Sequence, residues 1–246
     1  MESTKKSASR IRKLYIAKLI GRIIILCICA FLCWKKVEEF DIIYDFFGKF
    51  SWFHILWVIW MIDMFCQLMP VKDRIALGSQ KLFGHKFKPV KDMINYQKLQ
   101  NYIVSTTKSA YKIFIIWTIF IGAFGVLYYN NIIGDICLVM ACVVFYVCDL
   151  ICVLIWCPFR LIMKNKCCTT CRIFNWDHLM MFTPLVYVSG IFSRSLLIVS
   201  IIVWLIWEVS VMIYPERFWE FSNAALKCKN CTDKLCTQYC QKLRKK

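Results

Sequence analysis

Two segments of the chain carry closely spaced cysteines, a residue type that binds soft metals and exchanges electrons. The first segment reads KNKCCTTCRIFNWDHLM, and the second reads LKCKNCTDKLCTQYCQKL. Each contains a C-x-x-C pair, a spacing that lets two thiolates converge on one ion. The candidate metal ligands are Cys157, Cys167, Cys168, Cys171, Cys228, Cys231, Cys236 and Cys240.

The chemistry open to these thiols depends on how the two segments lie. Residues 172–227 separate the C-x-x-C pairs, so one shared four-cysteine zinc site requires the chain between them to leave and return. Two separate sites are the alternative, each suited to zinc or to an iron–sulfur cluster. Dithiol redox chemistry, palmitoylated anchoring and inert thiols are further readings. In a reducing compartment, metal binding or working thiols are favoured over structural disulfides.

The elements that must position these thiols are membrane helices. The chain has 246 residues, of which 60% are hydrophobic, well above the fraction usual in globular domains. Continuous rather than alternating apolar runs favour helices over a barrel. We therefore predict an all-α, polytopic integral membrane protein with six transmembrane helices, arranged as hairpins over 15–70, 113–159 and 179–214. The six apolar runs cover residues 15–34, 52–70, 113–129, 136–159, 179–192 and 196–214.

The first apolar run follows a basic start, as a signal peptide does, but no small-residue cleavage site follows it. We therefore expect an uncleaved helix. Lys18 and Arg22 interrupt its beginning, and we expect both side chains to snorkel to the membrane surface.

The distribution of Lys and Arg predicts the orientation of the helices, because cytoplasmic loops carry the excess. With six crossings and a cytoplasmic N-terminus, 28 of the 32 basic residues lie on the cytoplasmic side. Both termini and both cysteine segments are then cytoplasmic. The protein itself is expected to lie in the cell (inner) membrane. The net charge of +17 indicates attraction to anionic lipid headgroups rather than to nucleic acid.

This orientation divides the chain into three parts. A basic cytoplasmic N-terminus covers residues 1–22, and the six-helix membrane domain covers 15–214, with cytoplasmic loops at 71–112 and 160–178. A basic, cysteine-rich tail follows at 215–246. The 71–112 loop is too short to bury a core of its own, so we expect it to lie along the membrane surface or to dock a partner.

Three acidic residues, Asp63, Asp149 and Glu208, lie within predicted spans. Each precedes a proline by seven to nine residues, which places all three at a similar depth of roughly 10–14 Å. A carboxylate in a bilayer is costly, so proton acceptance or cation coordination is one reading, and pairing with a basic group or an amide is the other. Asp149 has no basic neighbour within a turn and must find its partner on another helix.

Eight further cysteines lie in or at the ends of spans, where a thiol usually packs as a small hydrophobic group. Among them, Cys148 and Cys152 share a helix face beside Asp149.

No nucleotide-binding or hydrolase motif accompanies these features, so the sequence assigns no enzyme class. The leading hypothesis is a membrane protein with a cysteine-bound metal or iron–sulfur site for electron transfer or metal-linked redox chemistry, together with a cytoplasmic redox or assembly partner. One alternative is a transporter of protons or a soft metal cation that uses the three acids. Another is an assembly subunit whose zinc-stapled face holds a soluble partner.

Overall fold

The computed structural model describes residues 2–35, 43, 45–48, 50–70, 76–90, 94–165, 167–231 and 233–235, with the backbone alone for residues 2–10. Within these ranges the chain is helical, and its extended pairing is confined to one isolated bridge between Pro89 and Asn223. The predicted all-α class is therefore confirmed for the described part of the chain.

Five longer helices form the body of the molecule: α1 (Glu2–Lys35), α2 (Trp52–Gln67), α4 (Tyr96–Tyr129), α5 (Asp135–Leu154) and α8 (Ile191–Ile213). In the described ranges, four of them, α1, α4, α5 and α8, are long and apolar enough to cross a membrane. Helix α2 is equally apolar but has only 16 residues, or about 24 Å at 1.5 Å per residue.

Short helices connect or extend these five. They are α3 (Leu77–Gln80), η2 (Gly84–Lys86), α6 (Phe159–Met163), η3 (Cys168–Thr170), α7 (Asp177–Phe182), η4 (Thr183–Tyr187), η5 (Pro215–Arg217), η6 (Ala224–Leu226) and η7 (Cys228–Asn230).

Local sequence explains where several helices begin. The Ser51 side chain caps α2 by accepting from the Phe53 N–H. The His54 side chain in turn accepts from the Ser51 N–H through Nδ1, and the two bonds form a capping box. The Asn95 side chain caps α4 in the same role. Gly190 precedes α8 with φ of 123°, a backbone conformation that a residue without a Cβ adopts readily.

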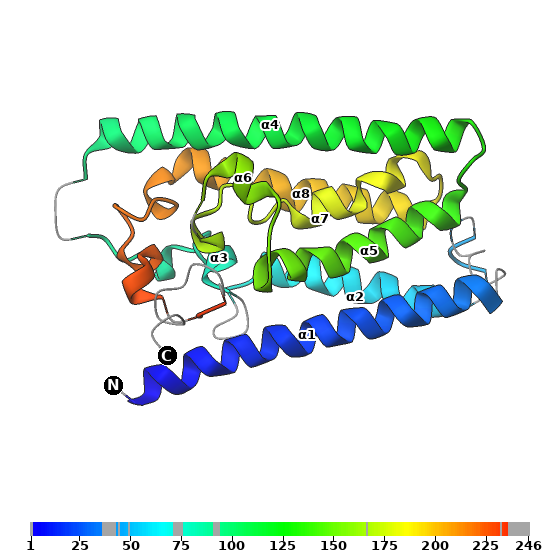
Figure 1. The fold of residues 1–246 in the computed structure, drawn as a ribbon, viewed down its shortest axis with the longest axis horizontal. Coiled ribbons are helices and arrows are strands. Elements are labelled where there is room, and N and C mark those ends of the chain that lie inside the picture. Colours follow the sequence, from blue (N-terminus) through cyan, green and yellow to red (C-terminus); the bar gives the residue numbers. More distant parts are fainter. Residues whose placement is uncertain are drawn as a thin grey trace.

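The long helices lie side by side along the long axis of the molecule (Figure 1). The chain runs away from one end in α1, α4 and α7–η4, and it returns in α2, α5 and α8. The start of α1 lies at the same end as α3, the described residues of 164–176 and those of 215–235. We call residues 164–165 and 167–176 the thiol loop, residues 215–231 and 233–235 the described tail, and this end of the molecule the cysteine-rich end.

The fifth predicted span differs from the expected continuous helix over 179–192. Helix α7 ends at Phe182, and the 3₁₀ helix η4 replaces it, with Pro184 in its first turn. Proline has no N–H to donate and disrupts a continuing α-helix, which explains the break. Whether α7–η4 completes a sixth crossing stays a prediction.

Most of the predicted segment 71–112 is described, and its second part is helical. Residues 96–112 are the first half of α4, whose 34 residues span about 51 Å and exceed the roughly 30 Å of a bilayer core. The preceding segment packs on the described tail: the Val90 N–H donates to the Ser222 carbonyl at 3.1 Å, and the Ala224 N–H donates to the Lys88 carbonyl at 2.7 Å. The described part of this segment therefore docks on its own chain.

Two hydrophobic clusters explain how the body and the cysteine-rich end hold together. The larger one joins α2, α5, η4 and α8 around Trp60, which contacts the rings of Phe182 and Phe192. A second cluster packs Trp176 of the thiol loop and Phe218 of the described tail against α4 and α8. The second cluster fixes the thiol loop to the ends of two membrane helices.

Candidate functional site

A buried lysine binds the backbone of the thiol loop. Lys81, which is 1% exposed, extends Nζ to the carbonyls of Thr169 and Cys171 at 2.8 and 3.0 Å. Its ammonium also faces the rings of Trp207 and Phe218. Burial lowers the pKa of Lys81 to about 7. Lys81 thus holds the loop that carries the first cysteines by two of its backbone carbonyls.

A second anchor comes from one of the predicted intramembrane acids. Arg172 Nη1 donates to Glu208 Oε1 at 2.8 Å, its Nη2 donates to Oε2, and Trp176 Nε1 donates to Oε1 at 2.7 Å. This bidentate pairing neutralises the carboxylate and satisfies both of its oxygens. Glu208 therefore fits the structural alternative, a carboxylate paired with a basic neighbour, and it ties α8 to the thiol loop.

The described tail returns to the same end and presents the second C-x-x-C pair. Asn223 organises it by accepting from the Ala225 N–H and donating to the Arg217 carbonyl at 2.9 Å. Asn230 then donates to the Ala224 carbonyl at 2.7 Å. Cys228 and Cys231 begin and follow the short helix η7, so both lie on a segment braced by side-chain amides.

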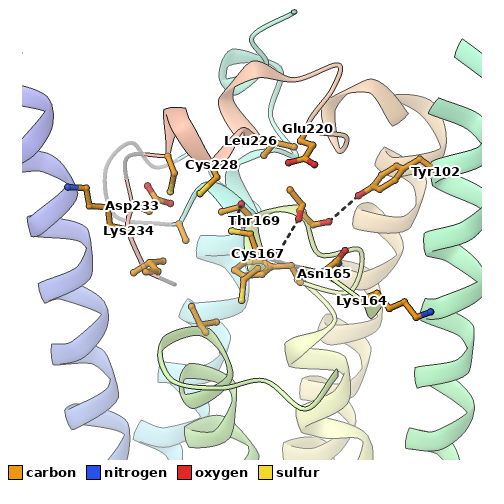
Figure 2. Close-up of a pocket in the computed structure, with 17 residues that line it drawn as sticks. Tyr102, Lys164, Asn165, Cys167, Thr169, Glu220, Leu226, Cys228, Asp233 and Lys234 are labelled. Carbon is orange, nitrogen blue, oxygen red and sulfur yellow. Dashed lines mark hydrogen bonds between the residues drawn. The ribbon is translucent and has the colours of Figure 1, made fainter. Parts of the chain in front are cut away.

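The two cysteine segments meet at one pocket. Cys167 and Cys168 of the thiol loop and Cys228 and Cys231 of the tail line a cavity of about 310 Å³ (Figure 2). Tyr102 of α4 borders it and donates to the Thr170 carbonyl at 3.3 Å. We call this cavity the thiol pocket. Between the two segments the chain runs away from the cysteine-rich end in α7–η4 and returns to it in α8, which brings the segments together (Figure 1).

The pairing differs in detail from the expected one. Cys171, the second member of the first C-x-x-C pair, does not line the thiol pocket, and adjacent Cys167 takes its place. Among the described side chains, no three His, Cys, Asp or Glu residues lie close enough to hold a metal ion. Cys236 and Cys240 lie outside the described residues.

A second cavity, of about 270 Å³, lies next to the first. Both cavities are bordered by Cys167, Cys168, Val153 and Phe174. We call the second cavity the aromatic pocket, because rings from α4, α5 and α6 line it: Trp117, Phe120, Phe145 and Phe159. Its cysteines are Cys148, Cys152, Cys157, Cys167, Cys168 and Cys171.

The remaining two intramembrane acids converge on one arginine. Arg22, which is 7% exposed, donates to Asp149 Oδ2 at 2.7 Å, to Asp63 Oδ2 at 2.9 Å and to the Tyr146 carbonyl at 2.6 Å. Its guanidinium carbon also lies 3.8 Å from the centre of the Tyr146 ring. The expectation that Arg22 snorkels to the surface is wrong. Inside the bundle, ion pairs with two carboxylates compensate for the desolvation of its guanidinium.

Sequence reasoning missed three basic residues that organise the site: Arg22, Lys81 and Arg172. The signal for Arg22 was its place within an apolar run, where an inward-facing charge requires a partner. Lys81 and Arg172 lie in segments with several other basic residues, so the sequence does not indicate that these two are buried.

Searches of protein-family models, of curated proteins and of solved structures find no match to this chain. The function is therefore argued from the two pockets and the side chains that line them.

Proposed function

We propose that this chain is a multi-pass protein of the cell (inner) membrane that holds an iron–sulfur cluster in the thiol pocket and transfers electrons. The observation that carries this proposal is the meeting of Cys167, Cys168, Cys228 and Cys231 at one cavity. Four cysteine thiolates are the usual ligand set of an iron–sulfur cluster. The positive charge bias favours a cytosolic location for this end, and thiols stay reduced in the cytosol.

The size of the cavity favours a cluster over a single zinc ion. Zinc needs its four sulfur atoms about 2.3 Å from one centre, so the ligands must crowd together. The four thiols line a cavity of about 310 Å³. A polynuclear cluster has several metal centres and holds its ligands farther apart. A zinc-stapled assembly subunit is the alternative that the experiment below separates.

The transporter alternative has less support. Asp63 and Asp149 would have to carry protons or cations, but both carboxylates bind Arg22. Glu208 is occupied by Arg172 in the same way. Each of these carboxylates would have to leave its guanidinium partner before it could bind a transported cation or proton.

Anaerobic purification of the full chain tests this proposal through its metal content and visible absorbance. We expect a brown protein with iron and acid-labile sulfide, and loss of both in Cys228→Ser/Cys231→Ser. Cys137→Ser is the matched control, because Cys137 is an exposed thiol in the first turn of α5 and lines neither pocket. Colourless protein with stoichiometric zinc supports the assembly subunit, and protein without either metal overturns both.

A further inference from the structure

The aromatic pocket contains a pair of thiols that the metal proposal leaves unused. Cys152 and Cys157 are hydrogen-bonded to each other, and each is a free thiol in the structure. Helix α5 ends at Leu154, and the N–H groups of Ile155 and Trp156 both donate to the Ile151 carbonyl. The second of these bonds spans five residues, as in a π-turn, and it turns the chain so that Cys157 reaches Cys152 in the last turn of the helix.

Two thiols in hydrogen-bond contact need only a small side-chain movement to form a disulfide. Both line the aromatic pocket, together with the rings of Trp117, Phe145 and Phe159. Trp117 and Phe145 contact each other at 5.2 Å between ring centres, in an edge-to-face arrangement. An oxidisable pair therefore lies on the wall of a cavity suited to a flat, apolar molecule.

The position of the cavity indicates how its occupant enters. Trp117 and Phe120 lie on α4 and Phe145 and Cys148 on α5, all within the helices that are apolar enough to cross a membrane. Phe120 is 43% exposed and Cys148 is also exposed, on helix surfaces that face lipid when the helices span the bilayer. A molecule dissolved in the membrane can reach the thiols without crossing the cysteine-rich end.

We propose that Cys152 and Cys157 form a redox-active dithiol that reduces a lipid-soluble quinone bound in the aromatic pocket. The two thiols release two electrons and two protons, and one S–S bond forms as two S–H bonds break. The quinone takes up both electrons and both protons, and its two carbonyl oxygens become the hydroxyls of the quinol. The thiols regain their reduced state by exchange with a cytoplasmic dithiol.

A quinone accounts for the pocket better than an acyl chain does. Either would fill an apolar cavity, but an acyl chain makes no use of a hydrogen-bonded thiol pair or of a lining of aromatic rings. Aromatic side chains bind a flat conjugated ring through offset or edge contacts. The assignment removes Cys157 from the candidate metal ligands, and it stands independently of the iron–sulfur proposal, because neither member of this pair lines the thiol pocket.

The test uses the purified full chain in detergent, reduced and then freed of reductant under anaerobic conditions. Decyl-substituted benzoquinone is added, quinol is followed by ultraviolet absorbance, and the oxidised cysteines are identified by alkylation and peptide mass spectrometry. We expect one quinol per chain and a disulfide between positions 152 and 157. The rate should fall at least tenfold in Cys152→Ser and in Cys157→Ser, and it should be unchanged in Cys137→Ser.

A second variant separates docking from indiscriminate thiol oxidation. Cys148→Phe should fill part of the pocket, so we expect it to slow oxidation by the quinone at least tenfold and to leave oxidation by the small reagent diamide unchanged. Equal rates of oxidation by the quinone in this variant and in the wild type overturn the assignment of the quinone to the aromatic pocket. Quinone adducts on scattered cysteines overturn the assignment of Cys152 and Cys157 as the reacting dithiol. Metal content is measured in parallel: its loss in Cys152→Ser or Cys157→Ser makes these thiols ligands and overturns the inference.

Discussion

Arg22 on α1 and Asp149 on α5 form an ion pair across 127 positions of sequence, with Nη1 of the arginine 2.7 Å from Oδ2 of the aspartate. Asp63 of α2 completes the contact from the other side at 2.9 Å. Helices α1, α2 and α5 are joined at one guanidinium. The pair identifies Asp149 as the partner of a buried cation, which was one of the two readings of its sequence position.

The first prediction concerns Asp149→Asn. The amide keeps the shape of the side chain but leaves Arg22 with one carboxylate, so the thermal midpoint in detergent should fall. Breaking a buried pair costs up to about 3–5 kcal/mol, and Asp63 retains part of that interaction. The double variant Asp63→Asn/Asp149→Asn should lose more than either single variant. A stable, fully functional Asp149→Asn shows that the carboxylate is a spectator, and a stable but inactive one shows that it relays protons or ions.

The second prediction concerns Glu208→Gln. Loss of the carboxylate leaves the Arg172 guanidinium, which is mostly buried, without its bidentate partner and loosens the thiol loop from α8. We expect a lower thermal midpoint and a reduced metal content in the same preparation. Glu216→Gln, in η5 and outside this contact, is the matched control and should match the wild type in both measurements. Unchanged metal content in Glu208→Gln contradicts a role for this pair in positioning the thiols.

The third prediction tests the packing of α4 against the broken segment η4. A Cβ added at Gly125 would lie 2.5 Å from the Tyr187 ring, whereas one at Gly122 meets nothing within 4 Å. Gly125→Ala should therefore destabilise the protein by about 1–3 kcal/mol, the usual cost of overpacking. Gly122→Ala, on the same helix, should be neutral or slightly stabilising, because alanine favours the helix. Equal midpoints for the two variants would falsify this contact.

The fourth prediction concerns topology. Six crossings place residue 131, between α4 and α5, on the opposite side of the membrane from both termini. A periplasmic reporter fused at residue 131 should be active, and the same reporter fused at the C-terminus should be silent. Activity at both positions shows that α7–η4 does not cross, and the thiols then have no assigned compartment.

The fifth prediction follows from the buried Lys81. Its pKa in the folded protein, about 7, lies below the ordinary value of 10.5, so between these limits the unfolded chain binds a proton that the folded chain does not. The contribution of this group to folding stability therefore rises with pH across that window. Thermal midpoints of the wild type relative to Lys81→Met should increase from pH 7 to pH 9. A difference that stays constant over this range contradicts the lowered pKa.

The sequence alone determined the helical class and the approximate limits of the main apolar helices. Long uninterrupted apolar runs satisfy their backbone hydrogen bonds within one helix, so their structure depends little on distant residues. Ser51 and Asn95 mark helix starts by capping, which is also a local effect. The sequence allowed the two cysteine segments to meet, because a helical hairpin between them can return to the end where it began, but it left open whether they form one site or two.

Only the tertiary structure decided which side chains meet. The choice of Arg22 as the partner of Asp63 and Asp149 depends on how three helices rotate about their axes, and apolar residues around each helix leave that rotation open. The entry of Cys167 in place of Cys171 into the thiol pocket depends on Lys81 holding the loop by its carbonyls. Each is set by packing between distant segments, which residue spacing does not encode.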